Sequence, residues 1–563
     1  MSGTEQDTNI ASVKSASKQS PDSAPGSVSG RGLFRSSAVV SAMTMISRVL
    51  GLARDMVFAR VIGADGLADA FFVAFKIPNF LRRLFAEGAF SQAFVPVLSE
   101  YRQQGSHAAV RALIARVSAA LGSVLLILTI LAVTGAPVVT AVFAPGFLGD
   151  EAKFAATATM IRVTFPYILF ISLAGLVSAI LNSYDRFAVP AFTPVWLNVC
   201  LIGAALVATP WFAEPVYALA WGVFAAGIVQ FVFQLPFLAR LHLMPRPVFD
   251  WKHEGVRRIL KLMVPALFGV SVSQINLLLD TVIASFLPEG SVSWLYYSDR
   301  LVELPLGVFG VAAATVILPR LSRQNTAKQN TSSQHTNEPP QHFNATLDWG
   351  LRFVLLIAVP ASIALIIIAE PVLVTLFYDG DGITQRDIYM AAASLRAYAV
   401  GLIAFMCIKV LVTGYFSRQD TRTPVRIGVI AMVSNMILNI ALVIPLHHYF
   451  KLGHTGLALA TSLAAFLNAI LLLRGLLRAG VYRPQRQWLR FAASLLVANA
   501  AMAALLLLVN FELEYWLALA FWTRMAMMLA LCAAGGLVYC ATLFLCGMRP
   551  RDLRADTHRV GID

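Results

Sequence analysis

Two groups of ionisable and polar side chains interrupt stretches of the sequence that are otherwise apolar. A charged group at the centre of a bilayer costs roughly 2.5–3.5 kcal/mol, so residues of this kind mark functional positions by default. Arginine is the main basic residue here, and its planar guanidinium forms paired hydrogen bonds with phosphate or carboxylate groups. These residue types indicate the binding of an anion at membrane depth. The candidates are Arg48, Arg54, Asp55, Asp69, Lys76, Arg82, Arg83 and Glu87 in the first group, and Ser293, Asp299, Arg300 and Glu303 in the second.

The spacing within the first group predicts a charged stripe along one helix. Intervals of 7, 7 and 4 residues separate Asp69, Lys76, Arg83 and Glu87. At about 100° per residue these intervals bring all four side chains to one face, where Arg83 and Glu87 can pair at i, i+4. Arg82 lies beside the stripe, with no obvious carboxylate near it. A purely structural interpretation, in which the charges pair internally and lock helices together, stays open.

The balance of charge in the two groups favours an anionic cargo. Together they contain six basic and five acidic side chains, so mutual pairing leaves a positive surplus. A cavity for a cationic drug would need the opposite surplus.

A third constellation consists of oxygen-bearing side chains. Asp280 lies inside one apolar segment, Asn435 and Asn439 share a face of another at i, i+4, and Thr461 lies in a third. Carboxylate, amide and hydroxyl oxygens suit a hard cation, so a cation site is one interpretation. Hydrogen bonding between helices is the other.

The composition predicts a polytopic α-helical membrane protein. Of 563 residues, 58% are hydrophobic and 13% are charged, whereas soluble proteins are about a quarter charged. Apolar runs of about 20 residues recur along the chain without β-type alternation, and about fourteen of them can span a bilayer. We expect spans centred near residues 47, 80, 130, 170, 198, 227, 272, 306, 360, 402, 436, 465, 498 and 534. The second is long and is interrupted by Pro78, Gly88 and Pro96.

The distribution of the net charge of +14 predicts the topology. Basic residues fall on alternate connections, which places those connections and both termini in the cytoplasm. The charge is therefore a topology signal and does not indicate a nucleic-acid partner. The sequence contains no Gx4GK[ST] loop, so ATP hydrolysis is not expected, and we expect a transporter and not an enzyme.

Two pairs of similar segments predict an internal repeat. "FVPVLSE" at 94–100 matches "ILPRLSR" at 317–323, and "SYDRFAVPAFTPVW" matches "YFSRQDTRTPVR" farther along. The offset corresponds to six spans, an even number, so the halves form a parallel repeat around a central cavity. We expect a disordered cytoplasmic N-terminus (1–33), an N-lobe of six spans (34–246), a C-lobe of six spans (247–486), two further helices (487–548) and a cytoplasmic tail (549–563). A flexible loop is expected at Gln324–Asn344.

Four segments resemble the MurJ (MviN) family of bacterial lipid II flippases, within the multidrug/oligosaccharidyl-lipid/polysaccharide exporter superfamily. They are "SRVLGLARD", "DAFFVAFKIPNFLRRLFAEGAFSQAFVP", "SWLYYSDRLVELPLGVFGVA" and "SRQDTRTPV". The resemblance implies fourteen helices in two lobes, a cationic cavity for the diphosphate and headgroup, and a groove for the undecaprenyl tail framed by the last two helices. The family's functional charges would fall on Arg48, Arg54, Asp55, Asp69, Arg82, Glu87 and Arg300, and a sodium site known in part of the family on Asp280, Asn435, Asn439 and Thr461.

The function expected from this resemblance is movement of the lipid II headgroup to the periplasmic leaflet by alternating access, driven by the membrane potential or an ion gradient. No cofactor is expected, apart from Na⁺ as a coupling ion. Expected partners are lipid II, membrane lipids and the cell-wall synthesis machinery. Other flippases for polyprenyl-diphosphate oligosaccharides, and cation-coupled antiporters of the same superfamily, remain alternatives. A membrane-embedded transferase and a structural scaffold are more distant ones.

Overall fold

The computed structural model describes residues 30–83, 90–310, 317, 321, 341–484, 487–509 and 512–549. Throughout this part of the chain, every regular element is a helix. Helices are expected here, because a backbone that crosses a bilayer must satisfy its hydrogen bonds within the segment. The all-α fold class predicted from the sequence is confirmed.

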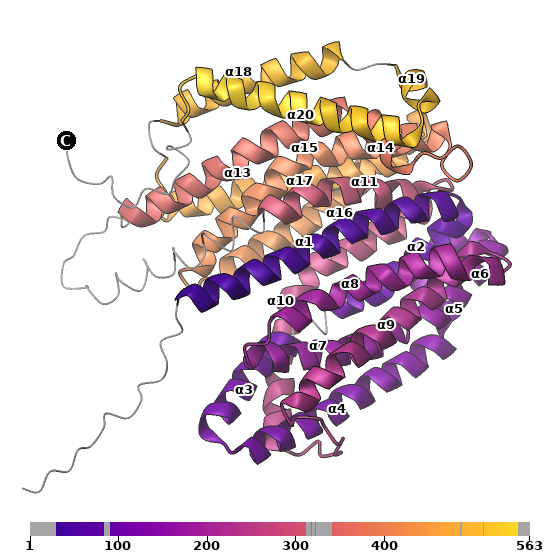
Figure 1. Ribbon diagram of the computed structural model, residues 1–563, viewed down its shortest axis with the longest axis vertical. Coiled ribbons are helices and arrows are strands. Elements are labelled where there is room, and N and C mark those ends of the chain that lie inside the picture. The colour runs from indigo at the N-terminus through magenta and orange to yellow at the C-terminus, as the bar shows by residue number, and fades with distance from the viewer. Residues whose placement is uncertain are drawn as a thin grey trace, which may run out of the picture.

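The first half of the bundle consists of nine α-helices in the described residues (Figure 1). They are α1 (Gly30–Val61), α2 (Gly66–Arg82), α3 (Phe90–Gln104), α4 (His107–Thr134), α5 (Ala136–Phe143), α6 (Glu151–Thr164), α7 (Tyr167–Ser183), α8 (Ala188–Gly203) and α9 (Pro215–Arg240). Side chains cap several of these helices; Asp65 caps α2 and Ser106 caps α4.

The second half begins with α10 and is followed by a C-terminal pair. Its elements are α10 (Glu254–Ala284), α11 (Ser291–Pro305), the π-helical turn η5 (Leu306–Gly310), α13 (Gln341–Ile367), α14 (Ala369–Phe377), α15 (Gln385–Phe416), α16 (Arg422–Phe450) and α17 (Gly453–Arg478). The C-terminal segment contains α18 (Trp488–Leu508), α19 (Leu513–Ala518) and α20 (Phe521–Leu545). The helix α13 begins inside the segment Gln324–Asn344, so the last residues of the predicted loop are helical.

Ten helical segments in the described residues are long and apolar enough to cross a membrane. They correspond to the predicted spans centred near 130, 170, 198, 227, 360, 402, 436, 465, 498 and 534. The other four predicted spans, near 47, 80, 272 and 306, coincide with α1, α2–α3, α10 and α11, the helices that carry the candidate charges and Asp280. The predicted total of fourteen spans therefore stays a prediction. The helices of the four remaining spans carry charged residues, which lower their mean hydropathy.

The long second span contains α2 and α3, between which residues 84–89 lie outside the described part of the chain. Within the described residues, α2 ends at Arg82 and α3 begins at Phe90. Pro78 lies inside α2 and Pro96 inside α3, whereas Gly88 lies outside the described residues. One straight helix was not expected here, because a proline removes a backbone hydrogen bond and crowds the preceding turn.

Two groups of helices lie side by side in Figure 1, with α2–α9 in one and α11–α17 in the other. The helix α1 packs against α8 of the first group and α14 of the second, and α10 packs against α3 and α16. On the outer side of the second group, α18 contacts α13 and α20 contacts α14. The residue boundaries predicted for the lobes stay a prediction, but this arrangement places α1 and α10 between the groups and brings α2 into contact with α11.

One end of the space between the groups is closed by contacts between them. Gly63, with a φ of +62°, lies so close to Gly382 that a Cβ at position 63 would be 2.0 Å from the carbonyl oxygen of Gly382. Nearby, the backbone N–H of Gly146 donates to the hydroxyl of Ser285 at 3.0 Å. Glycine adopts this left-handed conformation without a steric cost, and only a residue without a Cβ permits so close a backbone approach.

Candidate functional site

A cavity of about 470 Å³ lies between the two groups of helices. Side chains of α1, α2, α8, α10, α11, α15 and α17 line it. Most of the candidate residues meet here, although they are separated by hundreds of positions in the sequence. The candidates that line the cavity are Arg48, Arg54, Asp55, Lys76, Arg82, Arg83, Asp280, Asp299, Arg300, Glu303 and Thr461.

Arg54 and Asp55 form the most tightly bonded part of this cavity. Nη2 of Arg54 lies 2.7 Å from Oδ1 of Asp55, and its Nη1 donates to Asn198 at 3.1 Å. The hydroxyl of Tyr296 in α11 donates to the same Asp55 oxygen at 2.8 Å. Because Tyr296 comes from the second half, this cluster joins the two groups of helices across the cavity wall.

Arg300 extends the same network toward the C-terminal end of α11. Its Nε lies 3.6 Å from Oδ2 of Asp55, and its Nη1 lies 2.7 Å from Oε2 of Glu303. The guanidinium also lies over the Tyr296 ring, 4.9 Å from the centroid. Arg300 is therefore shared between two carboxylates and an aromatic face, which fixes its position.

Arg48 differs from Arg54 and Arg300 in its partners. Its side chain lines the cavity but forms no hydrogen bond or ion pair with any other described residue. Arg83 likewise lines the cavity without a hydrogen bond or ion pair to a described residue, whereas Nε of Arg82 donates to Asn79 at 3.4 Å. The guanidinium of Arg48 is thus available to a ligand.

The charges on the cavity wall have a positive surplus. Among the described residues, six basic and four acidic side chains line it, the acidic ones being Asp55, Asp280, Asp299 and Glu303. Lys76 lies close to Thr281, with Nζ 3.4 Å from the hydroxyl oxygen. The surplus predicted from the sequence is present in the wall itself, and it suits an anion.

Asp69 and Ser293 are brought together by the structure, but away from the cavity wall. Oδ1 of Asp69 accepts hydrogen bonds from the backbone N–H and the hydroxyl of Ser293, at 2.9 and 2.7 Å. Its Oδ2 accepts from the backbone N–H of Gly290 at 2.9 Å and from Nζ of Lys153 at 3.3 Å. Asp69 therefore caps the N-terminus of α11 and holds the closed end together, so the predicted stripe does not face one common surface.

Glu87 and its predicted pair with Arg83 lie outside the described residues.

The four residues of the candidate cation site meet at the end of the cavity. Asp280 accepts hydrogen bonds from Asn439 at 2.7 Å, from Asn435 at 3.3 Å and from Thr461 at 3.4 Å. Asn435 also donates to Asn276 at 2.8 Å. The side-chain oxygens of Asn435 and Asn439 are buried without a hydrogen-bond partner in the described residues. The arrangement combines interhelical hydrogen bonds with acceptor oxygens that have no donor.

The structure places in these networks three residues that are not among the candidates predicted from the sequence. Asn198 binds Arg54 through its side chain and donates to the backbone oxygen of Ser47 at 2.9 Å. Tyr296 bonds to both Arg54 and Asp55. Lys153 binds Asp69 through its Nζ. A single polar residue inside an apolar span was the available signal for Asn198.

Comparison with known proteins gives one consistent result. The family model described as "Lipid II flippase MurJ" matches residues 58–527. The "Probable lipid II flippase MurJ" of Vibrio cholerae serotype O1 is 49% identical over 532 residues, covering 93% of this chain and 98% of that protein. The "Lipid II flippase MurJ" of Burkholderia cenocepacia is 41% identical over 530 residues, covering 92% and 98%.

Solved structures agree with these relatives. A structure titled "Lipid II flippase MurJ, inward closed conformation" is 27% identical and has a TM-score of 0.74, covering 92% of this chain and 99% of its own. An inward-facing multidrug resistance MATE transporter of the MOP superfamily has a TM-score of 0.61 at 14% identity, covering 78% and 98%. The second likeness concerns the fold alone.

Proposed function

Since the chain belongs to the MurJ family of lipid II flippases, we propose that its central cavity carries the lipid II headgroup across the inner membrane by alternating access. Members of this family are transporters and not enzymes, and the chain is a multi-pass inner-membrane protein. Lipid II is the family's substrate. The proposal concerns the residues that bind lipid II, the way in which its headgroup crosses the membrane and the driving force.

The observation that carries the proposal is the Arg48 guanidinium, which lines the cavity without an ion-pair partner among the described residues. A diphosphate presents several anionic oxygens, and a guanidinium can donate to two of them at once. Arg82, Arg83, Arg300 and Lys76 line the same space and add positive potential. We assign the diphosphate to these basic side chains and the sugar–pentapeptide to the remaining volume and its open side.

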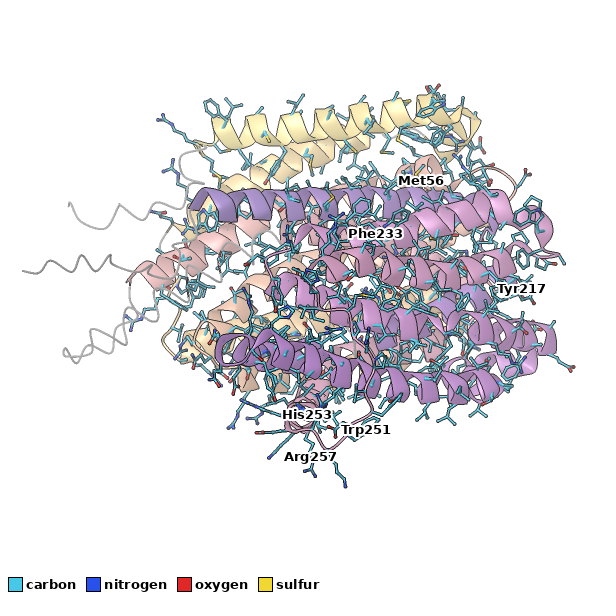
Figure 2. The ribbon with its side chains drawn as sticks, turned by 60° about the horizontal axis from the view of Figure 1, so that its bottom comes forward. Met56, Tyr217, Phe233, Trp251, His253 and Arg257 are labelled. Carbon is cyan, nitrogen blue, oxygen red and sulfur yellow. The ribbon has the colours of Figure 1, made fainter. Side chains whose placement is uncertain are left out.

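The orientation of this cavity follows from the distribution of basic residues. The connection between α9 and α10 contains Arg246 and Lys252, and Arg257 and Arg258 follow at the start of α10. Figure 2 shows Trp251, His253 and Arg257 together on one outer side of the bundle, well separated from Tyr217 near the start of α9. By the positive-inside rule we assign this segment and both termini to the cytoplasm, so the closed end near Gly63 faces the periplasm.

The undecaprenyl tail is proposed to stay in the bilayer beside α18 and α20. These helices pack on the outside of the second group and expose Leu489, Leu496, Leu529 and Leu537. Apolar side chains on this surface fit a lipid chain. The flipped headgroup is used on the periplasmic side, so the cell-wall synthesis machinery is the class of protein partner that we expect.

The driving force is proposed to be the membrane potential, with Na⁺ as a coupling ion. One charge moved through 100 mV yields about 2.3 kcal/mol. The donor set around Asp280 fits Na⁺, because rotating the amide of Asn435 or Asn439 would turn a buried, unpartnered oxygen toward the carboxylate and a shared cation. These residues and Thr461 would hold the ion, whose charge would offset that of Asp280.

The function is tested with purified protein in liposomes. Translocation of lipid II and of an unrelated prenyl-linked sugar is measured with and without a potential, in Na⁺ or in K⁺ buffer. We expect lipid II to move and the unrelated sugar to stay. Movement of only the unrelated sugar would contradict lipid II as the substrate. Equal rates of lipid II translocation in both buffers would contradict sodium coupling but not the substrate.

A further inference from the structure

Gly307 lies directly against the guanidinium of Arg48. A Cβ built on Gly307 would be 1.8 Å from Nη1, 2.2 Å from Cζ and 2.4 Å from Nη2 of Arg48. Atoms in ordinary contact are about 3.5–4.0 Å apart, so no side chain at position 307 is compatible with this place for the guanidinium. The contact joins η5 of the second half to α1 of the first.

We propose that Gly307 is a positioning residue for substrate binding, because its missing side chain makes the space in which Arg48 extends into the cavity. This inference rests on the proposed role of Arg48 in binding the diphosphate. According to this inference, diphosphate binding depends on the space beside Gly307 in the second half as well as on the charge of Arg48 in the first.

The backbone around Gly307 supports this role. Pro305 ends α11 without an N–H, and residues 306–310 continue as a π-helical turn. Proline breaks the regular hydrogen-bond ladder, and single π-turns inside helices occur frequently at functional sites. The irregular turn therefore places a residue without a Cβ directly against the guanidinium of Arg48.

Arg48 depends on this contact more than the buried Arg54 depends on any one of its contacts. Arg54 is held by hydrogen bonds to Asp55, Asn198 and Tyr296. Arg48 has no such bond to a described residue, so close packing on Gly307 is what the structure shows holding the end of its side chain. One arginine is fixed by polar partners and the other by shape.

Replacing Gly307 by alanine should displace Arg48 and leave the fold intact. The atoms that a Cβ would meet belong to the far end of a flexible side chain, which can swing away without moving the backbone. Gly122 in α4 is a matched control, because it lies outside the cavity lining and a Cβ there would meet no atom of the described residues within 4 Å.

The test compares Gly307→Ala, Arg48→Ala, the double variant and Gly122→Ala in lipid II binding and liposome translocation. We expect Gly307→Ala to weaken lipid II binding about tenfold, as for one lost hydrogen bond to a charged group. Arg48→Ala should weaken it at least as much, the double variant should match Arg48→Ala, and Gly122→Ala should match the unaltered protein. Thermal unfolding of Gly307→Ala in detergent should be unchanged.

The outcomes separate the two proposals. If Arg48→Ala binds and transports normally, the proposed role of Arg48 is wrong. If Arg48→Ala is impaired but Gly307→Ala is normal, or if Gly307→Ala has the same effect with and without Arg48, the positioning role is wrong. If Gly307→Ala instead unfolds at a lower temperature, the double variant must recover that loss, because removing the guanidinium removes the clash; failure to recover it would also overturn the inference.

Discussion

Asp69 in α2 binds Ser293 in α11 twice, through the backbone N–H at 2.9 Å and through the hydroxyl at 2.7 Å. The two residues are far apart in the sequence and belong to opposite halves of the bundle. Three of the four donors to Asp69 come from the second half, since Gly290 also contributes its N–H. When the halves separate at this end, the carboxylate must exchange those donors for water.

Asp69→Ala is expected to open the closed end. The substitution removes the acceptor of three hydrogen bonds between the halves, each to a charged group, and such bonds stabilise by about 1.5–3 kcal/mol. Distances between spin labels attached to the two halves near this end should shift toward longer values. Asp65→Ala is the matched control, because Asp65 only caps α2, accepting from Ala68 at 2.7 Å. Equal distance distributions for both variants would contradict a gating role.

Lys153→Met is expected to destabilise the same end for a different reason. Lys153 and Asp69 are both buried, at 7% and 1% exposure, and Lys153 is the cation that compensates the carboxylate. Removing one partner of a buried ion pair costs about 3–5 kcal/mol. Adding Asp69→Asn to Lys153→Met should recover part of the loss, measured by thermal unfolding and by the spin-label distances. A double variant less stable than either single one would show that the pair is not coupled.

The sequence predicted the chemistry of this region better than its geometry. The membrane fold followed from apolar runs, and the candidate charges of spans one, two and eight were found from their cost in a bilayer. Helical periodicity placed Asp69 on one stripe with Lys76, but it does not show that the first turn of α2 meets the N-terminus of α11. The partners Gly290 and Lys153 could not be predicted, because such contacts depend on how helices cross in three dimensions. The same holds for Gly307, whose role is visible only beside Arg48.

Arg82→Ala is expected to separate a transporter from a structural scaffold. Arg82 lines the cavity, so its loss should lower lipid II translocation by about tenfold or more while the protein stays inserted. A scaffold would keep its cellular function if it folded. Translocation in liposomes and complementation of a depleted strain are measured together. Arg186→Ala, at an exposed position outside the cavity lining, should be silent in both assays; normal translocation by Arg82→Ala would contradict its assignment.

Asp348→Ala is expected to loosen the attachment of the C-terminal helices. Asp348 in α13 is buried and accepts from Tyr482 at 2.8 Å and from Trp488, the first residue of α18, at 2.5 Å. It also pairs with Arg352 at 2.7 Å. Its removal takes the acceptor from these two donors and the carboxylate from the Arg352 cation, which should lower the free energy of unfolding by about 3–5 kcal/mol.

Asp348→Asn is the graded control for that experiment, because it keeps an acceptor oxygen and loses the charge. Unfolding followed by tryptophan fluorescence should rank the unaltered protein above Asp348→Asn, and Asp348→Ala lowest. A reversed order of the two variants would contradict the role of the hydrogen bonds.

The central claim is that cavity guanidiniums bind the diphosphate of the lipid. The most direct measurement is the affinity of the purified protein for lipid II and for an analogue with a single phosphate, compared with an Arg48→Ala/Arg83→Ala variant. We predict that the unaltered protein prefers the diphosphate by about tenfold and that the variant loses this preference, as expected for lost hydrogen bonds to a charged group. A variant that still distinguishes the two lipids to the same degree would contradict the account.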